Sequence, residues 1–179
     1  MTVLLVGIVV LIILIFLAIA IGIPLSMHIA RKSGAPFWPT PKKVMRRAMQ
    51  EVGLTPGEIF YDLGAGTGTS LIIAADEFGA RASGTEINIL PYVIARTKIF
   101  FLGSLARMKF ESFFDQDISD AHVVFCFLTE RTMKKLEPKL KTELKPGTRI
   151  VCYTFPFPTL KPTKIIPIKG NWKLFVYTI

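Results

Sequence analysis

The sequence contains little cysteine and little histidine. Its 179 residues include two of each, namely Cys126, Cys152, His28 and His122. These residues are not clustered at the spacing of metal ligands, so no metal centre is expected. Both cysteines lie in apolar runs, which predicts buried, reduced thiols and argues against a disulfide framework. We assign no chemistry to the two histidines.

Acidic residues are also few, and they are unevenly placed. The chain has 13 Asp+Glu against 22 Lys+Arg, a net charge of +9. Residues 28–47 and 145–179 each hold six bases and no acid, whereas residues 48–144 hold 10 bases and 13 acids. A basic protein suggests nucleic acid as a partner, but no aromatic-basic recognition motif is present, so none is expected. Basic segments beside a membrane are instead attracted to anionic lipid headgroups.

One long apolar run opens the chain, from Val3 to Met27, with 25 residues and no charge. As a helix it would extend roughly 37 Å, enough to cross the core of a bilayer. We predict a transmembrane helix over 1–27, a basic Pro-rich juxtamembrane linker over 28–41 and a folded domain over 42–179. A cleaved signal peptide would need a shorter run after a basic segment, and a buried core helix would need a polar face. By the positive-inside rule, the bases after the run place the domain in the cytoplasm and the protein in the cell membrane with a single pass.

Strands and helices alternate along the domain. Helices are predicted over 41–52, 69–78, 90–103 and 130–144, and strands over 58–63, 81–86, 108–110, 121–128, 148–155, 164–168 and 172–179. Thr40 is expected to cap the first of these helices and Pro41 to be its first residue. The alternation is typical of a parallel α/β sheet with helices on both faces, and the last two strands can form a closing hairpin.

A glycine loop follows the first predicted strand. It reads Asp62-Leu63-Gly64-Ala65-Gly66-Thr67-Gly68, and Glu86 ends the next strand. Glycines let the backbone turn tightly and approach a ligand. The carboxyl ends of the strands are where open α/β sheets bind ligands. The spacing differs from the G-x-G-x-x-G of dinucleotide sites, and no P-loop lysine follows.

The two acids favour one kind of ligand. Asp62 would repel a phosphate and suits a ligand with a cationic end, while Glu86 can accept hydrogen bonds from the hydroxyls of a ribose. S-Adenosylmethionine carries a sulfonium, an ammonium and a ribose. The alternative is a glycine turn that only connects a strand to a helix.

The motif D-L-G-x-G-x-G with a downstream strand-ending acid resembles motifs I and II of class I S-adenosylmethionine-dependent methyltransferases, across roughly residues 50–179. The resemblance implies S-adenosyl-L-methionine as the cofactor and a methyltransferase domain over 42–179. It implies a Rossmann-like sheet with helices on both faces, here preceded by one N-terminal transmembrane helix. By position, Asp62, Gly64, Gly66, Gly68 and Glu86 carry over from these motifs, and Ser112 and Phe113 match the segment near the adenine. With Phe37 and Thr67, these residues are the cofactor-binding candidates.

Two proline-aromatic stretches narrow the resemblance. They are Pro36-Phe37-Trp38-Pro39-Thr40-Pro41 and Tyr153-Thr154-Phe155-Pro156-Phe157-Pro158. With the N-terminal run, they resemble the ATP synthase c subunit lysine N-methyltransferase family and its small prokaryotic relatives. The resemblance implies methyl transfer to a lysine of a membrane protein. The segment Phe127-Leu128-Thr129-Glu130 departs from the [DN]-P-P-[YF] motif of amino-methylating enzymes that act on adenine, so base methylation loses support.

The catalytic candidates are Glu130, which could orient the amine, and Phe155 and Phe157, which could wall an apolar channel with Phe37 and Trp38. Such a channel lowers the pKa of a lysine amine. The alternatives are a helix N-terminal acid for Glu130 and ordinary packing for the aromatic residues. The expected partners are a membrane protein substrate and anionic lipid headgroups. A methyltransferase acting on a lipid or small lipophilic molecule and an inactive scaffold of the same fold stay open as other functions.

The predicted orientation can be tested on intact cells. Because the bases lie after the apolar run, residues 28–179 are expected on the cytoplasmic side. A protease added outside should leave this segment uncut, as followed by immunoblotting of the C-terminus. Digestion of the segment in cells whose cytoplasmic marker proteins stay intact would contradict the orientation.

Overall fold

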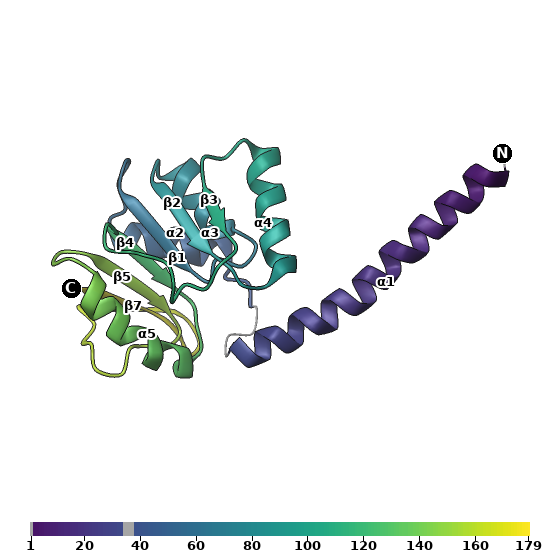
Figure 1. The fold of residues 1–179 in the computed structure, drawn as a ribbon. Coiled ribbons are helices and arrows are strands. Elements are labelled where there is room, and N and C mark those ends of the chain that lie inside the picture. Colours follow the sequence, from purple (N-terminus) through teal and green to yellow (C-terminus); the bar gives the residue numbers. More distant parts are fainter. Residues whose placement is uncertain (1, 34–37) are drawn as a thin grey trace.

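The computed structural model describes residues 2–33 and 38–179 and, within the first helix, the side chains at 6–18, 20–22 and 24. This helix, α1, spans Thr2–Ser33 and runs away from the rest of the molecule (Figure 1). Its described large apolar side chains are exposed. Taken over the residues that are described, no helix is long and apolar enough to cross a membrane.

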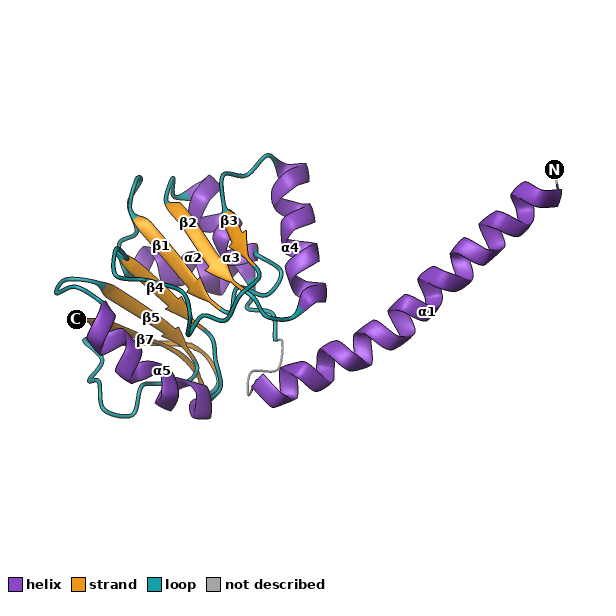
Figure 2. Ribbon diagram, viewed as in Figure 1, coloured by secondary structure: helices purple, strands orange, loops and turns teal. Residues whose placement is uncertain are grey.

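A seven-stranded mixed sheet forms the centre of the domain (Figure 2). Its strands are β1 Ile59–Leu63, β2 Arg81–Thr85, β3 Arg107–Lys109, β4 Val123–Cys126, β5 Arg149–Tyr153, β6 Lys164–Lys169 and β7 Trp172–Thr178. They lie in the order β3-β2-β1-β4-β5-β7-β6. The first five are parallel, and β7 is antiparallel to both of its neighbours. The predicted parallel sheet with a closing hairpin is confirmed.

Helices cover the two faces of the sheet unequally. They are α2 Lys42–Glu51, α3 Thr69–Ile72 with its π-helical continuation η1 Ile73–Glu77, α4 Ile89–Leu102 and α5 Glu130–Glu143. Met49 of α2, Leu71 of α3 and Ala95 of α4 share one buried cluster with Phe60 of the sheet. Leu136 of α5 belongs to the cluster on the opposite face. The prediction of helices on both faces is confirmed, and the two cysteines are buried and free as expected.

Two local features differ from the prediction. Pro41 precedes α2 as its cap, its carbonyl oxygen accepts hydrogen bonds from Val44 and Met45, and no side chain, that of Thr40 included, caps the helix. The predicted helix over 69–78 widens into a π-helical turn after Ile72, which places both Ile73 and Ala74 in the core.

Polar contacts fix α2 along the sheet. Nη1 of Arg149 in β5 donates to the carbonyl oxygens of Val52, at 2.6 Å, and Gly53, at 2.9 Å. Arg46 of α2 binds the carboxylate of Glu77 with two hydrogen bonds of 2.6 and 2.8 Å. The Arg149 contacts fix the C-terminal end of α2 at the start of β5. Met45 of α2 and the residues before the helix line the cavity described below.

Gly68 lies where the glycine loop, α3 and α4 meet. Its φ is +72°, and a Cβ there would lie 2.9 Å from the Cβ of Ala95 in α4. Glycine is required at this position both for the left-handed backbone and for the close approach of the helix.

Replacing Gly68 by alanine should therefore be more costly than replacing Gly103. Gly103 has a similar φ of +63° but nothing within 4 Å of a Cβ. Both replacements incur the strain of a left-handed alanine, about 1–2 kcal/mol. Only Gly68→Ala adds a steric contact, which we expect to cost about 1–3 kcal/mol more in the free energy of unfolding. Denaturation of both variants in detergent measures the difference, and equal losses would contradict this packing.

Candidate active site

A cavity of about 370 Å³ opens at the carboxyl ends of β1, β2 and β4. This volume is within the range of small-molecule sites. Its walls come from the glycine loop, from the segments after β2, β3 and β4, and from the residues before α2. The predicted cofactor residues that line it are Asp62, Gly64, Gly66, Thr67, Glu86, Ser112 and Phe113. The structure therefore brings together residues from three separate segments.

Gly84 of β2 allows the glycine loop to lie against the sheet. A Cβ at this position would lie 2.9 Å from both the Cβ of Ala65 and the carbonyl oxygen of Asp62. The Ala65 N–H donates to the carbonyl oxygen of Thr85 at 2.9 Å. Because position 84 has no side chain, β2 can hold the loop at hydrogen-bonding distance.

The carboxylate of Glu86 connects the loop to the segment after β2. Its Oε2 accepts a hydrogen bond from the Gly66 N–H at 3.1 Å. Its Oε1 accepts from the backbone N–H and the side-chain amide of Asn88, at 2.8 and 2.9 Å. A carboxylate has about four acceptor positions. One acceptor position, on Oε2, is therefore left for a ligand. The sequence suggested that Glu86 accepts hydrogen bonds from both ribose hydroxyls, whereas the structure leaves room for one.

Asp62 is a buried carboxyl group at the centre of the sheet. The Ser70 hydroxyl of α3 donates to its Oδ2. Burial raises the pKa of Asp62 to about 7, the hydrogen bond from Ser70 opposes this shift, and nearby Glu86 adds to it. The ionised form of Asp62 is therefore disfavoured in the free protein, and a cation in the cavity would favour it.

These groups fit S-adenosylmethionine. None of the ion pairs formed by the described residues involves Asp62 or Glu86. A buried carboxylate without a cationic partner is costly, and an ammonium or sulfonium would provide that partner. The remaining acceptor position of Glu86 suits a ribose hydroxyl.

The segment after β3 supplies the opposite wall. The Ser112 Oγ accepts from the Phe114 N–H at 3.2 Å, and the Asp115 N–H donates to the Ser112 carbonyl oxygen at 3.0 Å. The ring of Phe113 lies 4.6 Å from that of Phe114. This tight turn holds the Phe113 ring in the cavity wall, where it can contact an aromatic base.

An aromatic cluster adjoins the cavity after β4. Phe127 lines the cavity, and its ring centroid lies 4.8 Å from that of Tyr153 and 6.1 Å from that of Trp172. Tyr153 and Trp172 line a second hollow of about 550 Å³. Trp38 and the proline that follows it line both hollows. Aromatic side chains therefore line both the cavity and the hollow that shares Trp38 with it.

Of the other cofactor and catalytic candidates, those that the structure describes do not line this cavity. Phe37 lies outside the described residues. Gly68 packs against α4 instead. Glu130 begins α5, is 67% exposed, and its Oε1 lies 3.4 Å from the Nζ of Lys134. Phe155 is half-buried and packs with the cluster beneath α5.

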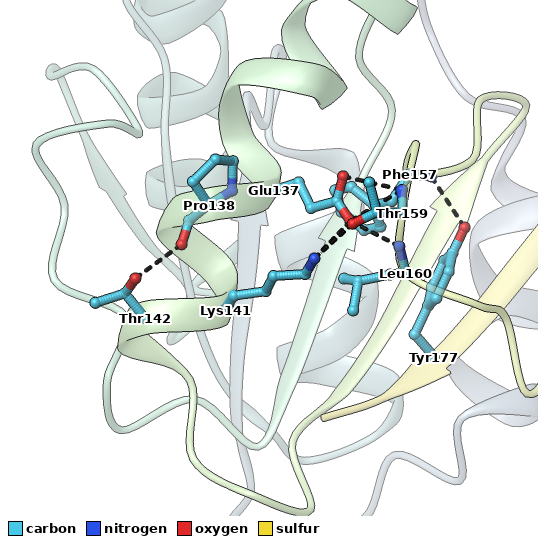
Figure 3. A network of polar contacts seen from close by, with 8 residues as sticks. All are labelled: Glu137, Pro138, Lys141, Thr142, Phe157, Thr159, Leu160 and Tyr177. Atoms are coloured by element: carbon cyan, nitrogen blue, oxygen red, sulfur yellow. Dashed lines mark hydrogen bonds and ion pairs between the residues drawn. The ribbon is translucent and has the colours of Figure 1, made fainter.

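The segment that carries Phe157 is fixed to α5 by a buried carboxylate (Figure 3). Oε1 of Glu137 accepts from the Thr159 hydroxyl and from the Leu160 N–H, each at 2.6 Å. The Phe157 N–H donates to the Tyr177 hydroxyl at 3.1 Å, and the two rings lie 5.2 Å apart. Phe157 is thus a core residue that does not line the cavity.

The sequence-based prediction did not include several residues that shape the site. Ser70 and Asn88 bond the two key carboxylates, and Lys135 and Phe127 line the cavity. The role of Gly84 could have been predicted from the sequence, because a glycine inside a strand often marks a place where another backbone segment approaches closely.

Comparison with known proteins gives consistent matches. The ANTKMT methyltransferase domain family matches residues 62–164. A protein-lysine N-methyltransferase of Saccharolobus islandicus is 39% identical over 146 residues, covering 79% of this chain and 91% of that protein. An ATP synthase c subunit lysine N-methyltransferase of Xenopus laevis is 27% identical, covering 82% of this chain and 65% of that protein. Among solved structures, an RNA methyltransferase of Salinibacter ruber in complex with S-adenosyl-L-homocysteine has a TM-score of 0.76 and 32% identity, covering 79% of this chain and 94% of that one.

Asp62→Asn should stabilise the free protein at alkaline pH. The pKa of Asp62 is about 7 in the folded state, against an ordinary value near 3.8. As pH rises between these values, the unfolded chain releases a proton that the folded chain keeps, so stability falls with pH. Asparagine does not titrate. We expect Asp62→Asn to raise the free energy of unfolding at pH 8 by on the order of 1–4 kcal/mol, at about 1.4 kcal/mol per pKa unit.

The same substitution should have little effect at about pH 3, because Asp62 is then largely protonated in both states. Thermal denaturation of the cofactor-free protein in detergent at the two pH values measures the difference. Asp115→Asn, at an exposed position, is the matched control. An equal effect of Asp62→Asn at both pH values would contradict the raised pKa.

Proposed function

Because the chain belongs to the ANTKMT methyltransferase domain family, we propose that its cavity binds S-adenosylmethionine and serves methyl transfer to a lysine of a membrane protein. The chain is an S-adenosylmethionine-dependent protein-lysine N-methyltransferase. The observation that carries the proposed site is the pair of buried carboxyl groups, Asp62 and Glu86, on one cavity without a basic partner among the described residues.

Each wall of the cavity has a proposed role toward the cofactor. Ionised Asp62 faces the cationic end, and Oε2 of Glu86 accepts a hydrogen bond from the ribose. The glycine loop with Thr67 lies under the sugar and methionine portions. Ser112 and Phe113 lie beside the adenine. The bound cofactor supplies an electrophilic methyl group on a sulfonium.

The aromatic cluster provides the proposed route for the lysine. The amine must be neutral to use its lone pair, and an apolar surrounding lowers its pKa. Phe127 lines the cavity and packs on Tyr153, and Trp38 lines both the cavity and the second hollow. They can exclude water from the amine and align it with the methyl group, and alignment is a large part of the rate enhancement available to such a transfer. Aromatic faces also attract the methylated cation that forms.

Membrane anchoring by the N-terminal helix is the second part of the proposal. The support is the run of 25 uncharged residues, the helical conformation of Thr2–Ser33 and the bases that follow the run. We place residues 1–27 in the cell membrane, residues 28–41 at its surface as a linker, and the methyltransferase domain, residues 42–179, in the cytoplasm. An anchored domain meets substrates in the same membrane, which agrees with relatives named for the adenine nucleotide translocase and for the ATP synthase c subunit.

The proposal is tested with methyl-labelled S-adenosylmethionine. The purified full chain is incubated with the labelled cofactor and with membranes, lipid extract and RNA from its host. We expect label on a membrane protein, recovered as methyl-lysine after hydrolysis. Glu86→Ala should lower the labelling by about 10²-fold or more, because the ribose contact and the support of the glycine loop are lost together.

Asp115→Asn serves as the matched acid-to-amide control and should label normally, since this side chain is exposed and does not line the cavity. Label recovered in RNA, the substrate class for which the Salinibacter ruber enzyme is named, would contradict the lysine proposal. Label in extracted lipid would contradict it in favour of a lipid methyltransferase. Failure of the unmodified chain to bind the cofactor in calorimetry would contradict the assigned site.

A further inference from the structure

The helix α4 presents large apolar side chains to solvent. Its exposed apolar residues, with those of the turn after it, are Ile89, Leu90, Val93, Ile94, Phe100, Phe101, Leu102 and Leu105. Phe100 and Phe101 are 78% and 79% exposed, and Leu105 is 88% exposed. A surface helix of a water-soluble domain normally turns charged or polar residues outward. This surface is therefore expected to be covered by something apolar.

The exposed apolar residues lie on one side of the helix, together with exposed Thr97. At about 100° per residue, Val93, Phe100 and Phe101 fall on the same half of the helix. Ala95 and Ile99 fall on the opposite half and are buried against the sheet. We call the exposed half, formed by Ile89, Leu90, Val93, Ile94, Phe100 and Phe101, the α4 face.

Positive charge borders the α4 face. On the helix, exposed Arg96 lies at one edge, about 90° from the centre of the face. Lys98 lies near the other edge, where it is half-buried and its Nζ donates to the Thr67 carbonyl oxygen at 3.4 Å. The chain from 87 to 110 contains four bases and no acid, and one of these bases, Lys109, forms an ion pair of 3.4 Å with Glu111, which follows this stretch. An apolar face with basic edges is typical of helices that lie in the plane of a membrane interface. A protein partner would need a matching apolar patch surrounded by acids. An anionic bilayer has apolar acyl chains beneath negatively charged headgroups at every point of its surface.

The position of α4 in the fold agrees with this occupant. α4 contacts α1, the proposed anchor, and both lie on the same side of the domain (Figure 1). The helix begins directly after Asn88, which lines the cavity. Tyr92 of α4 packs on exposed Phe110 with ring centroids 5.2 Å apart, which extends the apolar surface beyond the helix.

We propose that the α4 face lies in the headgroup region of an anionic bilayer, with its apolar side chains in the outer part of the acyl layer. The contact would bury the face by about 5–10 Å, the depth of interfacial helices. The inference rests on the proposed membrane anchoring and not on the cofactor site or the methyl transfer.

The test measures the membrane depth of single nitroxide labels on the full chain. The native cysteines, Cys126 and Cys152, are both 0% exposed, so an engineered surface cysteine can be labelled selectively. One variant is Phe101→Cys, on the α4 face. The matched control is Lys134→Cys on α5, a surface position on the other side of the sheet with a side chain that is 60% exposed. Both are reconstituted in vesicles of phosphatidylcholine and phosphatidylglycerol.

The proposal predicts opposite accessibilities at the two labels. The label at 101 should collide with oxygen, which concentrates in the acyl layer, and should be several-fold less accessible to a water-soluble nickel complex than the label at 134. In vesicles of phosphatidylcholine alone, this protection should weaken, because the basic edges lose their counter-charge.

Three results would overturn the proposal. Equal nickel accessibility at 101 and 134 would show that the α4 face stays in water. Protection of 101 from both oxygen and nickel would show that protein covers the face, either a second copy or α1 itself. Protection that persists unchanged in detergent micelles and in both vesicle compositions would also exclude a lipid-specific contact. A label at Phe100→Cys repeats the measurement, and none of these outcomes depends on cofactor binding or methylation.

Discussion

The close approach of the glycine loop to β2 is the contact on which the rest of the site depends. Only a residue without a side chain at position 84 leaves room for Ala65 and the backbone of Asp62. With the loop in this place, the Gly66 N–H reaches Glu86. The loop can then turn at Gly68 and enter α3 against α4. The position of the glycine loop, and with it this wall of the cavity, therefore depends on the absence of a side chain at position 84.

The geometry produced by this contact lowers the stability of the free protein and favours the binding of a cationic ligand. It holds two carboxyl groups in one cavity, and burial then disfavours the charge on Asp62. The stability that permits such a site comes from elsewhere, including the apolar clusters on both faces of the sheet and the buried hydrogen bonds of Glu137. Local electrostatic strain at a ligand site, supported by a well-packed scaffold, is common in enzymes.

Much of this arrangement could be predicted from the sequence, and the limits have physical causes. Alternating apolar segments and glycine turns identified every strand of the sheet, because these signals are local. The residues of the glycine loop and Glu86 were found because their chemistry follows from a short motif. The aromatic cluster around Phe127 was not predicted, since only the folded sheet brings together this residue after β4 and the side chains of β5 and β7. The core position of Phe157 could not be predicted for the same reason, because the carboxylate that fixes its segment lies 20 residues earlier, in α5.

The shortness of the connection before the domain sets a limit on which lysines the proposed enzyme can reach. Ser33 ends α1, and Trp38, five residues later, already lines the cavity. Five residues span at most about 18 Å of fully extended chain. For an enzyme anchored by α1, the length of this connection limits the distance between the end of α1 and the cavity. A neighbouring protein would be selected by the height of its lysine above the bilayer, and the residues around that lysine could vary widely.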